Sequence, residues 1–227
     1  MADETCWTLI EAAGAGDRAA GDHFAARYAP AVRAYLGARW GAGPLAAEVE
    51  DAQQEVFVEC LKEGGVLERV RRGTAGGFRA YLYGVVRNVA GRAEERRRRA
   101  FERGQEATFH PELTPAAEAT LSQVFDRAFA QGVLRQAVEL HGRRAREQGG
   151  DALARLELLR QRFQEGLAIA AIAARQGADA AQLHHAYARA REEFHACLRE
   201  VVGFHHPGAT TGEIDRECRQ LVELVEN

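Results

Sequence analysis

The sequence predicts an all-α protein, and three observations lead to that class. Apolar residues recur every three to four positions in most segments of the 227-residue chain. Valine and isoleucine are sparse, whereas alanine is abundant. No segment shows the alternation of apolar and polar residues that a half-buried strand requires. The length is enough for one large or two small domains, each able to bury a modest core.

Two helices are expected at the start of the chain. The first covers residues 5–13 and ends at Gly14 and Gly16. Asp17 is the expected N-cap of the second helix, because a short carboxylate accepts hydrogen bonds from the free amides of a first turn. Pro30 interrupts this second helix, and an interior proline can kink a helix. The apolar residues of the second helix repeat every four positions, at Phe24, Tyr28, Val32 and Leu36.

A third helix is expected over residues 46–63, between the turn at Gly41–Pro44 and Gly64. Its apolar face holds Val49, Ala52, Val56 and Cys60, with Phe57 and Leu61 beside them. Its polar face holds Asp51, Gln54, Glu55 and Glu59. A solvated surface is the usual place for such charges. The alternative is a surface that attracts a basic protein partner.

The next segment is basic. Residues 66–77, which include Arg71 and Arg72, are expected to form a loop. The following helix should bury Phe78, Leu82, Val85, Val86 and Val89. It carries Arg79, Tyr83 and Arg87 at spacings of four, with Tyr81, Asn88 and Arg92 beside the apolar stripe. Few acidic residues lie nearby in the sequence, so these arginines are expected to be unpaired. Unpaired arginines between tyrosines suit stacking on unpaired bases and contacts with phosphates.

Charge is segregated along the chain, although the formal net charge is only −3. Residues 1–65 carry five basic and eleven acidic side chains, whereas residues 66–103 carry eleven basic and four acidic ones. Residues 132–202 are nearly balanced, with eleven and nine. The run Arg96–Arg99 is as well explained by a solvated helix end near the C-terminal dipole as by phosphate binding.

The second half of the chain begins with an expected linker. Residues 104–120 contain Pro111, Pro115 and several acidic residues but little apolar periodicity. Long helices are expected over 121–148 and 151–163. A short alanine-rich helix, a turn at Gly177 and a longer helix then have the arrangement of a helix-turn-helix. The last segment should form an amphipathic helix with Ile214, Cys218, Leu221 and Leu224 on one face.

Two motifs resemble those of bacterial sigma factors. EDAQQEVF, at residues 50–57, is similar to the acidic helix that docks on RNA polymerase. FRAYLYGVVRNVA, at residues 78–90, is similar to the helix that reads the promoter. Their spacing and the later helix-turn-helix resemble the extracytoplasmic-function (ECF) group, which keeps only sigma domains two and four. The longer region before the helix-turn-helix, with the tail EIDRECRQLVELV, looks like a sigma-like subgroup.

The resemblance implies two helical domains and a set of functional residues. Residues 1–103 would be domain two, 104–120 an acidic linker, 121–202 domain four and 203–227 a C-terminal amphipathic tail. Docking on the clamp helices of the large polymerase subunit would use Asp51, Gln54, Glu55 and Glu59. The −10 promoter element would meet Arg71, Arg72, Arg79, Tyr81, Tyr83, Arg87, Asn88 and Arg92. The −35 element would meet Gln182, His184, His185, Arg189 and Arg191.

The implied function is transcription initiation at a subset of promoters, including help in promoter melting. The implied partners are core RNA polymerase, promoter DNA and an anti-sigma or other regulatory protein. One departure concerns the recognition helix, where His184 and Ala186 stand in place of two basic residues of the family. Two alternatives therefore stay open. The first is a sigma-derived regulator that has lost promoter reading in domain four, and the second is a helical module that binds only a protein.

Other functional classes find no support in the sequence. No nucleophile–base set stands out, so no enzyme activity and no cofactor are expected. The histidines and cysteines between His184 and Cys218 fit no standard zinc spacing, so no metal is expected. The four cysteines are scattered, which suits a reducing compartment. No apolar run approaches the ~20 residues of a membrane span, so a soluble, cytoplasmic protein is expected.

Overall fold

A computed structural model describes residues 6–41, 43–62, 65, 67, 77–104, 115–206 and 208–226. Within these ranges the secondary structure is entirely helical, which confirms the prediction of an all-α fold. The helices are α1 (Cys6–Gly14), α2 (Arg18–Trp40), the 3-10 turn η1 (Ala46–Glu48), α3 (Val49–Leu61), α5 (Gly77–Glu102), α6 (Pro115–Gln148), α7 (Gly150–Phe163), α8 (Ile169–Gln176), α9 (Ala180–His205) and α10 (Thr211–Glu226).

Helix ends follow local chemistry that can be read from the sequence. Asp17 caps α2 as predicted, and its carboxylate accepts a hydrogen bond from the amide of Ala20 at 2.9 Å. The helix then continues past Pro30 to Trp40. Gly177 ends α8 in the left-handed conformation (φ 62°), which glycine adopts without steric cost. Asp179 caps α9 through the amides of the first turn.

The start of α6 corrects one prediction. The expected linker was to extend to residue 120, but α6 begins at Pro115, so the linker prediction is wrong for residues 115–120. A proline is tolerated in a first turn because its missing N–H would have no partner in the helix. Glu118, also in the first turn, complements the positive end of the helix dipole. Residues 105–114 lie outside the described residues.

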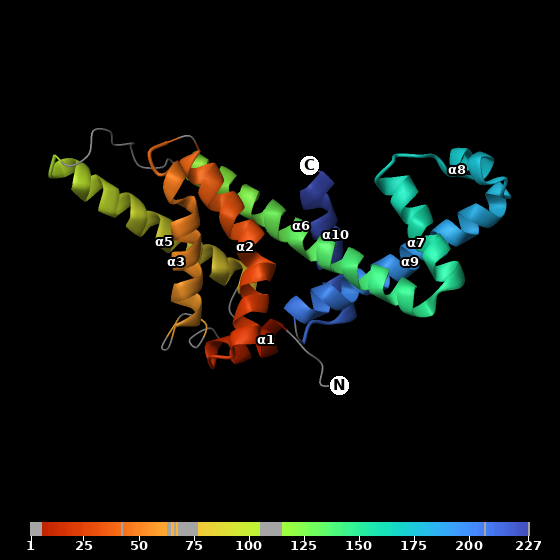
Figure 1. Cartoon of the computed structure of the whole chain (residues 1–227), viewed down its shortest axis with the longest axis horizontal. Helices are drawn as coiled ribbons and strands as arrows, with labels where there is room; N and C mark the ends of the chain where they lie inside the picture. The colour runs from red at the N-terminus through yellow and green to blue at the C-terminus, as the bar shows by residue number, and fades with distance from the viewer. Residues whose placement is uncertain are drawn as a thin grey trace.

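Helix α6 is the central helix, on which most of the other helices pack. It is 34 residues long, and Figure 1 shows it crossing the molecule from α2 to the α7 end. Helices α2 and α10 both contact its first half, and α7 and α9 also pack on it. Helix α9 returns along α6, so that its last turns also reach α1. The chain therefore brings its N-terminal and C-terminal helices together on one central helix.

One hydrophobic core joins both halves of the chain. It contains buried residues of α1, α2, α3 and α5, of α6 as far as Ala137, and of the last part of α9. Cys218 and Leu221 of α10 belong to the same core. A second, smaller cluster of Leu158, Ile169 and Ile172 holds α7 and α8 at the far end. Packing thus continues across the predicted boundary between residues 103 and 121, and the two-domain division stays a prediction.

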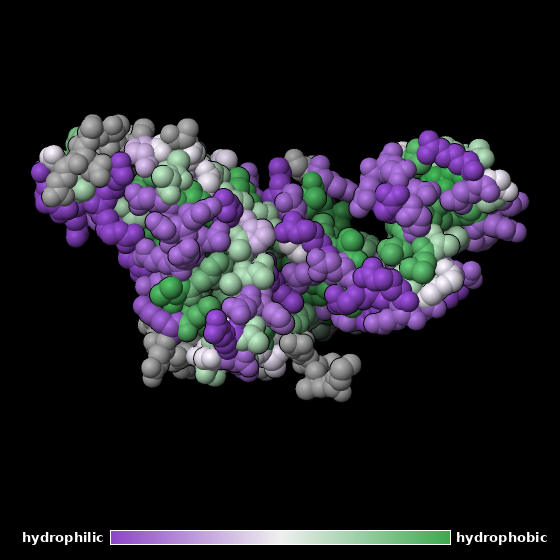
Figure 2. Space-filling view, in the orientation of Figure 1, coloured by the Kyte–Doolittle hydropathy of each residue, from purple (hydrophilic) through white to green (hydrophobic). Residues whose placement is uncertain are grey.

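The visible face of the molecule is mostly hydrophilic. In Figure 2, apolar residues show in the hollow between α10 and the α7 end, around α8, and in a smaller patch over the lower part of α3. No helix of the described residues is long and apolar enough to cross a membrane.

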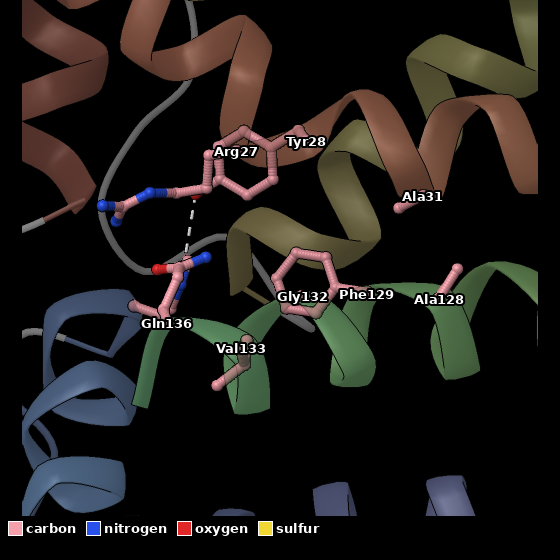
Figure 3. Close-up of a pocket in the computed structure, with 9 residues that line it drawn as sticks. Arg27, Tyr28, Ala31, Ala128, Phe129, Gly132, Val133 and Gln136 are labelled. Carbon is pink, nitrogen blue, oxygen red and sulfur yellow. Dashed lines mark hydrogen bonds between the residues drawn. The ribbon is translucent and has the colours of Figure 1, made fainter. Parts of the chain in front are cut away.

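The junction of α2, α6 and α9 is built from aromatic rings. The rings of Tyr28 and Phe129 stack with centroids 5.9 Å apart, and Figure 3 shows the two residues facing each other from α2 and α6. His205, at the end of α9, lies with its ring centroid 5.6 Å from that of Phe129. Its Nδ1 is 3.3 Å from the hydroxyl of Tyr28. Burial, together with the nearby charges of Arg27 and His206, lowers the pKa of His205 to about 3.

We expect this buried histidine to make folding sensitive to mild acid. Its pKa in the unfolded chain is about 6.5, so between that value and about pH 3 only the unfolded state binds the proton. The free energy of unfolding should therefore fall with decreasing pH, by up to about 1.4 kcal/mol per pH unit from this group. Urea unfolding between pH 5 and pH 7 measures the slope. H205Q should have a shallower slope than wild type, whereas H184N, on the exposed start of α9, should keep the wild-type slope.

Candidate nucleic-acid and partner interface

The outer face of α3 is open to solvent. Asp51 and Gln54 are exposed, as the sequence predicted. Val58 lies one turn further along the same face and is 60% exposed, and several other apolar residues of the described chain are exposed as well. The opposite face is anchored in the core by Ala52, Val56 and Cys60. Helix α3 therefore presents a small apolar side chain bordered by acidic and amide groups.

Two other carboxylates of the predicted docking set face α5 instead of open solvent. Glu55 lies 3.2 Å from Arg92 and 2.9 Å from Arg96, measured between carboxylate oxygen and guanidinium nitrogen. Glu59 lies 3.3 Å from Arg92 and also contacts Lys62. The acidic set is thus divided: Asp51 and Gln54 point outward, whereas the other two hold α3 to α5.

The side of α5 that faces α6 is also covered. The ring of Tyr83 lies between those of Tyr35 and Phe125, with centroid distances of 5.5 and 5.4 Å. Its hydroxyl donates a hydrogen bond to Glu118 at 2.7 Å. The Nε of Arg87 lies 3.3 Å from the same carboxylate. Tyr83 is therefore packed between helices, and it is not the open stacking platform that the sequence predicted.

The prediction that the arginines of α5 are unpaired is wrong. Arg79 contacts Asp126 of α6 at 3.5 Å, while Arg87 and Arg92 contact the glutamates described above. Each arginine of the run Arg96–Arg99 also contacts a carboxylate. Many of these acidic partners belong to α3 and α6, far from the basic block in sequence. Counting charges within one segment could not reveal them.

A nearly buried ion cluster lies where α2, α5 and α6 meet. The Arg39 side chain is only 8% exposed and donates two hydrogen bonds to Glu94, at 2.7 and 2.9 Å. Trp40 donates a third bond to the same glutamate, at 3.0 Å. On its other side Arg39 reaches Glu118 at 3.2 Å and the Tyr35 hydroxyl at 2.5 Å. One guanidinium therefore joins three helices.

Glu118 receives enough donors to stay ionised. Burial alone would raise its pKa, but the hydrogen bond from Tyr83 and the charges of Arg39 and Arg87 lower the pKa below its ordinary value. The pKa of Tyr83 is raised, first by burial and then by its hydrogen bond to Glu118. At neutral pH the site is thus a carboxylate held by neutral hydroxyls and guanidinium groups.

Part of the α5 surface remains accessible. The side chain of Arg87 is 59% exposed in spite of its contact with Glu118, and Asn88 is exposed beside it. Gly84 and Gly91 lie one turn to either side, and a Cβ atom at either position would meet nothing within 4 Å. A planar base or a sugar–phosphate strand can therefore approach the α5 backbone closely here. Tyr81 is half-buried, while Arg71 and Arg72 lie outside the described residues.

The helix-turn-helix stands at the far end of the molecule, where α8 and α9 pack on α7 (Figure 1). Gln182, His184 and His185 are exposed on the first turns of α9. Arg189 is exposed and lies 3.5 Å from Glu193 of the following turn. The guanidinium of Arg191 lies 5.9 Å from the ring centre of Tyr187. All five predicted −35 residues belong to α9, but the helix divides them: Gln182, His185 and Arg189 lie on one exposed side, whereas His184 and Arg191 lie on the opposite exposed side.

Comparisons with family models, curated proteins and solved structures returned no match to this chain. Among the described residues, no group of histidine, cysteine or acidic side chains could hold a metal ion.

Sequence reasoning missed four residues that shape this interface: Arg39, Glu94, Glu118 and Val58. The arginine and the two glutamates were missed because their structural role depends on contacts between helices that are far apart in the chain. Val58 carries a local signal, since a valine among Asp51, Gln54 and Glu55 interrupts the polar face of an amphipathic helix.

We expect Glu94 to matter more for stability than its neighbour Glu95. E94A would leave the nearly buried Arg39 without its bidentate partner, and the free energy of unfolding should fall by about 2–3 kcal/mol. E95A removes only contacts with Arg98 and Arg99 on the surface and should have a much smaller effect. Chemical denaturation of both variants provides the measurement. Equal losses would show that the Arg39 cluster has no special weight.

Proposed function

We propose that this chain is a sigma factor of the extracytoplasmic-function type, which directs bacterial RNA polymerase to a subset of promoters and helps to melt them. The observation that carries the proposal is the juxtaposition of two surfaces on neighbouring helices. The outer face of α3 is acidic with an exposed valine, and the adjacent α5 offers Arg87 and Asn88 beside open backbone at two glycines. A protein that joins a polymerase to an opened strand needs both surfaces close together.

The α3 surface has the composition of a protein-docking site. Asp51 and Gln54 would meet a basic helix on the clamp of the large polymerase subunit, and Val58 would be buried in that contact. Complementary charge speeds association and fixes orientation, while a buried apolar side chain adds affinity. Glu55 and Glu59 would contribute less directly, because they already hold Arg92 and Arg96.

The α5 surface suits an unpaired strand of the −10 element. Arg87 would contact a phosphate or a base plane, and Asn88 would hydrogen-bond a base edge. Arg79, Tyr81 and Arg92 would border this binding region, whereas Tyr83 would support it from inside the packing between α5 and α6. The exposed start of α9, with Gln182, His184, His185, Arg189 and Arg191, would contact the −35 element. This activity would take place in the cytoplasm, with no cofactor.

One observation favours the alternative of a helical module that binds only a protein. The basic residues of α5 are largely neutralised by the protein's own carboxylates, and residues 132–202 are close to neutral. A sigma-derived regulator without promoter reading would share these features. Promoter opening separates the sigma factor from both alternatives. Purified chain and core polymerase should start transcripts from discrete sites on genomic DNA in vitro, and sequencing those transcripts identifies the promoters. Transcription no different from that of core polymerase alone would overturn the proposal.

The docking surface can be tested by charge and by shape. D51K should weaken co-purification with core polymerase about tenfold, because it places a cation against a basic partner. V58A should weaken it less, by loss of apolar contact alone. E139K makes the same charge change on an exposed position of α6 and is the matched control. Circular dichroism should show equal helicity in all three variants. Undiminished binding by the double variant D51K/V58A would exclude this surface.

The two DNA-contacting regions should differ in importance. R87A/N88A should abolish open-complex formation, because a good hydrogen-bonded contact between a side chain and a base contributes about 1–3 kcal/mol and the proposed −10 contact is needed for melting. H184A/H185A should reduce transcription less, since that region carries little net charge. Permanganate footprinting of melted promoter DNA compares the two variants directly. A larger defect in the histidine variant would reverse this ranking.

A further inference from the structure

We propose that the first turn of α6 is an autoinhibitory latch, in which the Glu118 carboxylate occupies Arg87 and competes with the phosphate of a single strand for that arginine. This inference rests on the proposed function of α5. It adds that the free protein masks part of its own strand-binding surface.

The geometry places four donors around one carboxylate. Oε1 accepts hydrogen bonds from Tyr83 at 2.7 Å and from Tyr35 at 3.3 Å, and it lies 3.3 Å from Nε of Arg87. Oε2 accepts a hydrogen bond from Arg39 at 3.2 Å. Arg39 and Tyr35 belong to α2 and hold the latch in place, whereas Tyr83 and Arg87 belong to the proposed strand-binding helix. A single side chain of α6 therefore connects the scaffold with the candidate site.

Carboxylate and phosphate make equivalent contacts with arginine. Both offer anionic oxygens to the guanidinium N–H groups, so Arg87 can exchange one for the other. Asp126, 3.5 Å from Arg79, extends the acidic cover by two turns along α6. Arg87 is nevertheless 59% exposed, so an incoming strand can reach it while the latch is still closed. Strand binding then only has to displace Glu118 from Arg87.

The first turn of α6 is also the part of the helix that can open most easily. The first four amides of a helix have no partner within the helix, and helix ends unfold locally at low cost. Residues 117–120 include no buried side chain, and the buried residues that follow them in α6 begin with Leu121 and Phe125. Displacing the Glu118 carboxylate from Arg87 therefore removes no apolar side chain of this turn from the core, and α6 remains anchored from Leu121 onward, while Arg39 and Tyr35 can keep their own contacts with Glu118.

The latch predicts a gain of binding on removal of one charge. E118Q keeps the size of the side chain but weakens its hold on Arg87. If the closed state holds 80–90% of the free protein, E118Q should bind a labelled single-stranded oligonucleotide about five- to tenfold more tightly. Both proteins would make the same Arg87–phosphate contact once bound, so the salt slope of the two should differ by less than about 0.7, the value for one phosphate contact on a single strand. Fluorescence anisotropy over a range of salt concentrations measures both quantities.

Three further variants make the result specific. E139Q removes the same charge from an exposed position of α6 and should change binding little. E118D keeps the charge but shortens the side chain, so a gain in E118D would come from the contact itself. In the double variant E118Q/R87A the gain should disappear, because the released arginine is missing. Hydrogen exchange of the amides of residues 118–121 should be faster in E118Q than in wild type.

Each outcome has a definite meaning. Tighter binding by E118Q that is lost in E118Q/R87A supports the latch. If R87A weakens the binding of wild type while E118Q binds like E139Q, the latch is wrong and the proposed strand-binding role of α5 stands. If R87A leaves the binding of the oligonucleotide unchanged, the role of α5 fails, and the latch fails with it. Faster exchange in E118Q without tighter binding would show that Glu118 only stabilises the helix end.

Discussion

The burial of the Arg39 guanidinium is the constraint on which the arrangement of the helices depends. A nearly buried cation must be matched by anions, because an unpaired charge in the interior costs several kcal/mol. Glu94 of α5 and Glu118 of α6 meet this need from two different helices. The pairing therefore fixes α5 and the start of α6 against α2 at one point, where hydrophobic contacts alone would permit sliding. The accessible groups of α5 owe their orientation to this point.

Much of the fold follows from local sequence rules. The apolar repeat of α5 correctly places Phe78, Leu82 and Val86 in the core, and Asp17 and Gly177 mark helix ends where capping chemistry requires them. The candidate site could be predicted only in part. Asp51 and Gln54 are exposed as expected, but the partners of Arg87 and Tyr83 come from a helix that starts more than a turn earlier than its apolar periodicity indicates. The first turn of α6 is held in place by the polar side chain of Glu118, so the sequence there shows no repeat of apolar residues that would predict a helix.

The charge pattern in space differs from the charge pattern along the chain. Residues 66–103 are strongly basic as a segment, yet α3 and α6 bring Glu55, Glu59, Glu118 and Asp126 against them. The positive electrostatic potential that residues 66–103 exert on a distant phosphate is therefore weaker than their composition suggests. A phosphate must come close to α5 before the contact becomes favourable. Recognition would then depend on geometry near α5 more than on long-range attraction.

The uninterrupted length of α6 has a further consequence. At 1.5 Å per residue its 34 residues span about 50 Å; α5 contacts its first turns, and the middle of α9 packs beside His141 in its later turns. On the proposed function, the strand-binding helix and the helix-turn-helix are thus separated by a spacer that neither stretches nor bends easily. If both regions bind DNA as proposed, the protein would measure the distance between two DNA segments, and a promoter with one base pair more or less between them would have to distort its own helix to fit.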